Sequence, residues 1–171
     1  MLVRQYVFGL FGDIQKYIND PQGQFLPELI RHCSINVQYD ESNVTAAGFG
    51  EEAAYSQGYG EGKHTRIAVC VNACWALGEV AGLCSQQTQR AVYMRQAFEP
   101  YIPSTVGRMV TLLSRPKLDK GLAQNLAGAL GRIALASPDS LSNEALEAIM
   151  RNWCLSLRML QDQAEKASAY R

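Results

Sequence analysis

The most constraining feature of the sequence is one helical segment that occurs three times. The segment VCVNACWALGE (Val69–Glu79) has a close copy, LAQNLAGALGR (Leu122–Arg132), and a fainter one, VRQYVFGLFGD (Val3–Asp13). Each copy ends in a glycine followed by a charged residue. Because recurrence of one helical unit is the mark of a stacked array, the sequence predicts a helical-repeat protein.

The spacing between the copies predicts the type of repeat. Gly12 and Gly78 are 66 residues apart, and Gly78 and Gly131 are 53 apart. Without two irregular segments, 40–64 and about a dozen residues over 85–96, both intervals become about 41 residues, within the roughly 40–47 residues of HEAT repeats. The predicted fold class is therefore all-α, a HEAT-repeat α-solenoid in which antiparallel helix pairs stack into a superhelix.

Apolar residues at helical spacing predict helices along almost the whole chain, and no segment reads as a strand. The predicted helices cover 2–18, 25–37, 65–84, 90–98, 100–114, 118–136 and a region from 142 onward, with a last helix reaching 171. In a HEAT repeat the first helix of the antiparallel pair is called A and the second B. As one array, the predicted helices form a B helix (1–18), a repeat (25–84), a second repeat (100–136) and a truncated repeat (142–171). The insertion 40–64 is rich in glycine and acidic residues and lacks periodicity, so we expect it to be disordered. Helical patterns at both ends lead us to expect a fragment of a longer array.

One tryptophan lies opposite the apolar side of the central copy. On a helical wheel, the apolar stripe of this helix consists of Val69, Cys70, Ala73, Ala76, Leu77, Val80 and Cys84. Trp75 falls nearly opposite, flanked by Ala68, Asn72, Glu79 and Gly82. Either another helix or loop covers the indole, or the indole is a contact for a binding partner, because exposed Trp is enriched at interaction hot spots.

Composition argues against several classes of function. Sixteen basic residues balance sixteen acidic ones, so there is no bulk attraction to nucleic acid or to an anionic membrane. No apolar run is expected to approach membrane-spanning length. The five scattered cysteines are typical of reduced thiols in an intracellular protein.

Cysteine spacing also argues against a metal site. Cys70 and Cys74 are one helical turn apart and His64 is near, but a structural zinc site needs four ligands and no second pair follows at usable spacing. These thiols are better explained as small buried apolar groups. We therefore predict no enzyme activity, no catalytic residue, no cofactor and no metal.

Several stretches together resemble a known family. They are VRQYVFGLFGD (Val3–Asp13), VCVNACWALGE (Val69–Glu79), PYIPSTVGRMVTLLSRP (Pro100–Pro116), LAQNLAGALGRI (Leu122–Ile133) and WCLSLRMLQDQAEKASAYR (Trp153–Arg171). They resemble consecutive late repeats, in the C-terminal arch, of the transportin family of HEAT-repeat nuclear import receptors, which is in the importin-β class. The resemblance covers the chain outside 40–64 and 85–96.

The resemblance implies a function and a set of partners. It implies binding of cargo proteins, often RNA-binding proteins, through extended, net-basic nuclear localisation signals of the proline-tyrosine type. It also implies release of cargo by the GTP form of Ran, passage along FG-repeat nucleoporins through the full-length receptor, and shuttling between cytoplasm and nucleus. No direct binding to nucleic acid or membrane is implied.

The same resemblance implies cargo-binding residues on the B helices. These are Gln5, Asp13, Asn72, Trp75 and Glu79. The chemistry of the residues agrees, since an indole can bind a cation and carboxylates can pair with Lys or Arg; the alternative for each carboxylate is a solvated surface charge. Arg132 is expected to pair with an acid of a neighbouring repeat. Gly128 stands at the repeat position of Trp75, where the family tends to have a bulky apolar residue.

Two other functions are compatible with parts of the pattern. A HEAT-repeat interaction scaffold unrelated to nuclear transport would share the fold and use other surfaces. Binding to a basic proline-tyrosine peptide separates that scaffold from an import receptor. A metal protein would be identified by metal analysis of the purified chain.

Overall fold

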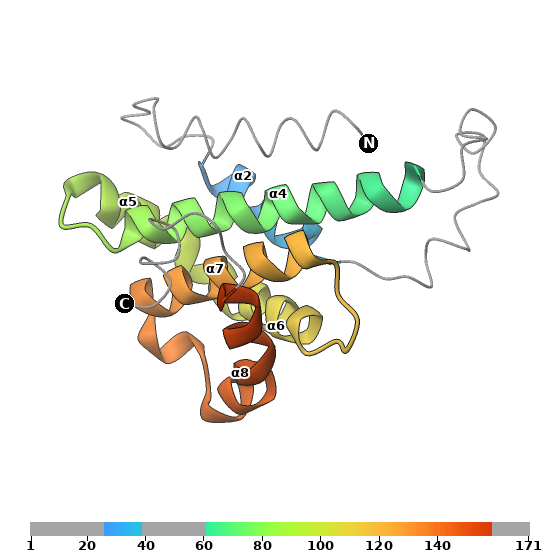
Figure 1. The fold of residues 1–171 in the computed structure, drawn as a ribbon. Helices are drawn as coiled ribbons and strands as arrows, with labels where there is room; N and C mark the ends of the chain where they lie inside the picture. Colours follow the sequence, from blue (N-terminus) through green and yellow to red (C-terminus); the bar gives the residue numbers. More distant parts are fainter. Residues whose placement is uncertain (1–25, 39–60, 159–171) are drawn as a thin grey trace.

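The computed structural model describes residues 26–38 and 61–158 (Figure 1). Every regular element among these residues is a helix. The elements are α2 (Leu26–Asn36), α4 (Glu61–Cys84), α5 (Gln89–Phe98), the 3-10 turn η3 (Glu99–Tyr101), α6 (Ile102–Leu113), α7 (Lys120–Ala136), the 3-10 turn η4 (Pro138–Ser140) and α8 (Asn143–Arg158). The predicted helix 1–18, most of the insertion 40–64 and the end of the predicted repeat 142–171 lie outside the described residues.

The described helices agree with the periodicity of the sequence except at one boundary. The helix that carries the central copy begins at Glu61, not at residue 65, so the last four residues of the predicted insertion are helical. The insertion boundary at 64 is therefore wrong. Apolar periodicity marks only the part of a helix that packs against other elements, and backbone hydrogen bonding continues beyond that part. The short helix expected over 90–98 is present as α5.

The helices stack in two layers. Helix α6 contacts α2 and α8 in one layer, while α4 contacts α7 in the other. Across the layers, α2 packs on α4, and α7 packs on both α6 and α8. Helices α4 and α7 run in the same direction (Figure 1), as successive copies of one repeat must. The described part is therefore all-α, with helix pairs stacked as in HEAT-type arrays.

Helix α4 is the centre of the core. All seven residues of its predicted apolar stripe are buried, and Cys74 and Ala81 are buried with them. The segment Arg66–Cys84 is long and apolar enough to cross a membrane by composition, which corrects the expectation that no run approaches that length. More than half of this segment is buried in the fold. Contact with α2, α5 and α7 explains its apolar composition.

A glycine sets the distance between α4 and α7. A Cβ atom placed on Gly78 would lie 3.3 Å from the Cα of Ala129 and 3.4 Å from its Cβ. These contacts are at or inside the short end of ordinary van der Waals distances. The small residues at this contact therefore allow the two backbones to pack closely, with Gly78 as the repeat glycine of the central copy.

Polar side chains of neighbouring elements satisfy the carbonyl groups left open at helix C-termini. Arg108 donates through Nη1 to the Ser34 carbonyl of α2 at 2.6 Å. Arg95 donates through Nη2 to the Cys84 carbonyl of α4 at 2.6 Å. In the same way, Asn152 donates through Nδ2 to the Leu113 carbonyl of α6 at 2.7 Å. Each bond joins a helix end to a later element and so fixes the stacking order.

Candidate peptide-binding surface

One face of α4 carries the predicted site residues. Asn72, Trp75 and Glu79 are three and four residues apart, so they lie on the same side of the helix. All three are half-buried, while the opposite stripe is fully buried. Trp75 is absent from the buried core and from the partly buried residues packed against it. The structure thus places the indole on the side of α4 away from the core. Gln5 and Asp13 lie outside the described residues.

The carboxylate of Glu79 is bound by the next repeat. Its Oε1 accepts a hydrogen bond from Nη1 of Arg132 on α7 at 2.7 Å, and the two side chains are 20 % and 17 % exposed. The two residues are 53 apart in sequence, which equals the interval between the repeat glycines Gly78 and Gly131. Residues at equivalent repeat positions therefore face each other across α4 and α7. The expectation that Arg132 pairs with an acid of a neighbouring repeat is confirmed.

Two glycines one turn apart on α4 leave room for the side chain of Arg132. The Cδ of Arg132 lies 3.9 Å from where a Cβ of Gly82 would stand, and its Nη1 lies 3.4 Å from that of Gly78. The arginine thus extends over the backbone of α4 to reach Glu79. Sequence reasoning did not assign this role to the glycines. The sequence did contain a signal for the contact between Glu79 and Arg132, because the 53-residue interval between the repeat glycines also separates these two residues.

The equivalent position to Trp75 on α7 is Gly128, and it is buried. The repeat position that carries the indole on α4 therefore has no side chain on α7.

The buried cysteines are poorly suited to chemistry. Burial raises the pKa of the Cys33 thiol to about 12 and that of Cys84 to about 11. Burial, together with a hydrogen bond that the Cys74 thiol donates to Cys70, holds the pKa of Cys74 well above its ordinary value. Since the thiolate is the reactive and metal-binding form, these residues act as small apolar groups of the core. Among residues 26–38 and 61–158, no three His, Cys, Asp or Glu side chains group as a metal site.

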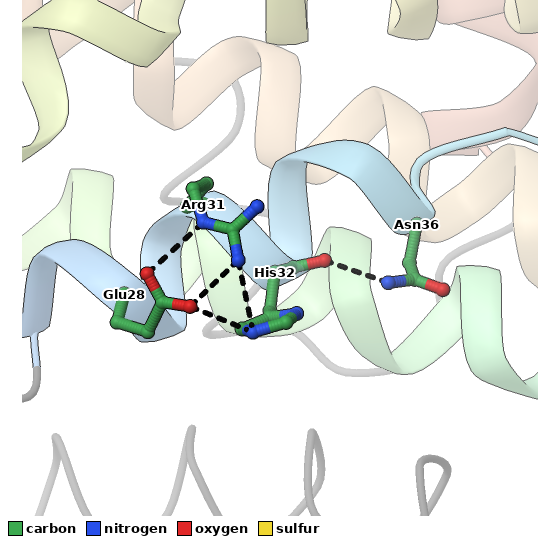
Figure 2. A network of polar contacts seen from close by, with 4 residues as sticks. All are labelled: Glu28, Arg31, His32 and Asn36. Atoms are coloured by element: carbon green, nitrogen blue, oxygen red, sulfur yellow. Dashed lines mark hydrogen bonds and ion pairs between the residues drawn. The ribbon is translucent and has the colours of Figure 1, made fainter.

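A second polar cluster lies on the exposed side of α2 (Figure 2). Glu28 accepts two hydrogen bonds from Arg31: Nη2 donates to Oε1 at 2.6 Å, and Nε donates to Oε2 at 3.0 Å. The same Oε1 lies 2.9 Å from Nε2 of His32. The Arg31 hydrogen bonds, with the charges of Arg31 and His32, lower the pKa of Glu28 from 4.5 to about 2. Asn36 donates to the His32 carbonyl at 2.8 Å. The cluster is local to one helix and shares no residue with the α4 face.

A shallow depression of about 150 Å³ lies between the α6–α7 connection and α8. Its lining residues are Leu113, Arg115, Pro116, Leu118, Ala123, Asn152, Leu155 and Ser156. None of them belongs to α4, so the depression is separate from the candidate surface.

These features define a class of protein: an all-α helical-repeat protein with a half-buried tryptophan and an ion pair on one helix layer. No family model matches the chain. Over 105 residues, 61 % of the chain, it is 35 % identical to Transportin-1 of Mus musculus and of Homo sapiens. It is 25 % identical to Transportin of Dictyostelium discoideum over 99 % of the chain, and 25 % identical to Importin subunit beta-2 of Saccharomyces cerevisiae over 98 %. The chain is therefore similar in sequence to transportins and to importin subunit beta-2.

The chain is short compared with these relatives. It covers 10 % of Transportin-1 in Mus musculus and Homo sapiens, 14 % of Transportin in Dictyostelium discoideum and 15 % of Importin subunit beta-2. The names describe transport and import proteins, and none describes an enzyme.

Proposed function

We propose that this chain is part of a nuclear import receptor and that the face of α4 that carries Asn72, Trp75 and Glu79 binds cargo on the concave surface of the array. The cargo would carry an extended, basic localisation signal of the proline-tyrosine type, as found in many RNA-binding proteins. The whole receptor would carry it along FG-repeat nucleoporins between cytoplasm and nucleus and release it when GTP-bound Ran binds. The relationship to transportins and importin subunit beta-2 supports this proposal.

The observation that carries the proposal is the position of Trp75. Its indole lies outside the apolar core of α4, between Asn72 and Glu79 on one helix face. Aromatic side chains in such positions supply large contact area at a low cost in conformational entropy, and they dominate interaction energies. The aromatic face also attracts the Lys and Arg side chains of a basic segment. Gln5 and Asp13, on the preceding copy, would extend the same surface.

Truncation of the indole tests this function. In the Trp75→Ala variant we expect the affinity for a synthetic basic proline-tyrosine peptide to fall by about 2 kcal/mol or more, which is the hot-spot threshold. Because Trp75 is not part of the core, the free energy of unfolding should fall by clearly less than the ~3–5 kcal/mol of a buried Trp→Ala change. Fluorescence anisotropy gives the affinity and thermal melting gives the stability.

The matched control removes an aromatic side chain that lies on another helix and is more exposed than Trp75. Tyr93 on α5 is 57 % exposed, and Tyr93→Ala should leave peptide affinity unchanged. Equal losses in both variants would indicate non-specific adhesion of the peptide to aromatic side chains. Unchanged affinity in Trp75→Ala with a collapsed melting temperature would make Trp75 a core residue and contradict the proposal. A protein that binds other partners but no basic peptide would be a general HEAT-repeat scaffold.

A further inference from the structure

The ion pair next to Trp75 leaves polar atoms unused. The hydrogen bond between Glu79 and Arg132 occupies Oε1 and Nη1, whereas a carboxylate has two acceptor oxygens and a guanidinium has five N–H donors. Within residues 26–38 and 61–158, neither side chain has a second hydrogen-bond partner. Both side chains remain partly accessible to solvent. A hydrogen-bond acceptor and a hydrogen-bond donor thus lie side by side at the α4–α7 contact.

The pair is poorly suited to binding a basic side chain. A Lys or Arg of a ligand would have to compete with Arg132 for Glu79, and separating a partly buried pair leaves one charge without compensation. Arg132 is also confined, because its stem passes over Gly82 and its guanidinium lies over Gly78. The net charge of the pair is zero, so it offers little long-range attraction to a cation.

The pair is well suited to binding a peptide group. In an extended chain, the N–H and the C=O of one residue point to the same edge, which is how antiparallel strands exchange two hydrogen bonds. A carboxylate oxygen can accept from that N–H while a guanidinium N–H donates to that C=O. Trp75 precedes Glu79 by four residues, one turn of about 5.4 Å along α4. A side chain next to the bound peptide group would therefore meet the indole.

We propose that Glu79 and Arg132 together bind the main chain of an extended ligand peptide, at one residue, rather than its basic side chains. This inference rests on the proposed function. The ion pair would select ligands whose backbone is extended. Basic side chains of the ligand then contribute their affinity elsewhere. The ion pair also links the ligand to both α4 and α7, so that one peptide residue contacts two repeats.

Backbone methylation of the ligand tests the proposal. A basic proline-tyrosine peptide is synthesised as a series with a single N-methyl group at each successive residue, which removes one N–H at a time. We expect one position at which methylation weakens binding to the wild-type chain by about tenfold, the effect of losing a hydrogen bond to a charged group. The same methylated peptide is then titrated into a chain with Glu79→Leu and Arg132→Met. Apolar replacement of both partners of an ion pair is often tolerated by the fold.

In that double variant the methylated and unmethylated peptides should bind equally, because the interaction that methylation removes is already absent. The salt dependence of affinity should match that of the wild type. An equal loss on methylation in both proteins, or a weaker salt dependence in the variant, would overturn the proposal. If the variant does not fold, Glu79→Arg with Arg132→Glu restores the pair with donor and acceptor exchanged, and the sensitive position must then move along the peptide. A wild-type chain that binds no peptide would instead defeat the proposed function itself.

Discussion

At the scale of single residues, the fold assigns different tasks to side chains that look alike in the sequence. Glu79 and Glu28 are both acidic residues on helices. Glu79 pairs with Arg132 of the next repeat, with both side chains largely covered. Glu28 forms its bonds within one turn of α2, at an exposed surface. Trp153 donates through Nε1 to the Ala127 carbonyl at 2.8 Å, whereas Trp75 lies off the core. The two tryptophans thus have a structural role and a proposed binding role respectively.

The Glu28 cluster predicts a pH dependence. Since the pKa of Glu28 is about 2 in the folded state and its ordinary value is 4.5, the unfolded chain takes up the proton first as pH falls. The contribution of Glu28 to stability is therefore complete above about 4.5 and disappears as pH falls to about 2. Urea unfolding of the wild type and of Glu28→Gln should give curves that differ at neutral pH and converge at low pH. High salt should reduce the difference, because the group is exposed; a difference that persists at pH 2 would contradict the assignment.

At the scale of helices, the contact between α4 and α7 is the central packing contact of the described residues. Helix α4 is covered by α2, α5 and α7. The close approach at Gly78 and the ion pair one residue later lie at the same level of the two helices. Closeness of the backbones and pairing of the charges therefore depend on each other.

Substitution of Gly78 tests this dependence. In Gly78→Ala the new Cβ would press on the Ala129 backbone at 3.3 Å, and we expect a net loss of about 1–3 kcal/mol of stability, the range for overpacked sites. Gly107 on α6 is the matched control, because no heavy atom lies within 4 Å of its added Cβ. Gly107→Ala should raise the stability by up to about 1 kcal/mol through helix propensity alone. Thermal melting measures the stability of both variants. A Gly78→Ala variant that is more stable than the wild type would show that the α4–α7 contact has space for a methyl group.

Much of this level of structure could be predicted from the sequence. The spacing of apolar residues predicted α2, α5, α6 and α7 within a few residues, together with the buried stripe of α4. The start of α4 at Glu61 could not be predicted, because the polar segment before Thr65 carries no periodic signal. The particular acid that pairs with Arg132 was not predicted either, since Glu79 is 53 residues away in the sequence. Helical spacing shows that Glu79 lies on the side of α4 opposite the apolar stripe. Only the alignment of the two repeats shows that Arg132 is close enough to bind Glu79.

At the scale of the whole molecule, the chain has no net charge to attract a basic ligand. Its sixteen basic and sixteen acidic residues balance, so the proposed recognition depends on local geometry. That geometry is an indole, an amide and an ion pair on one layer of a stacked array. The stack itself supplies the rigidity, because the C-terminal ends of α2, α4 and α6 are each tied to a later element by a polar side chain. A repeat architecture of this kind presents an extended surface that suits an extended ligand.

Tryptophan fluorescence tests the central claim most directly, because the chain contains only two tryptophans. Trp153→Phe removes one indole and its hydrogen bond to Ala127, at a cost of about 1 kcal/mol, and leaves Trp75 as the only tryptophan of the chain. Selective excitation of tryptophan, at the long-wavelength edge of its absorption, keeps the tyrosines of the chain and of a basic proline-tyrosine peptide from contributing emission. We predict that titration with this peptide shifts the emission of Trp75, with the same midpoint as binding measured by anisotropy. Binding with no change in Trp75 emission would contradict the assignment of the α4 face as the peptide-binding surface.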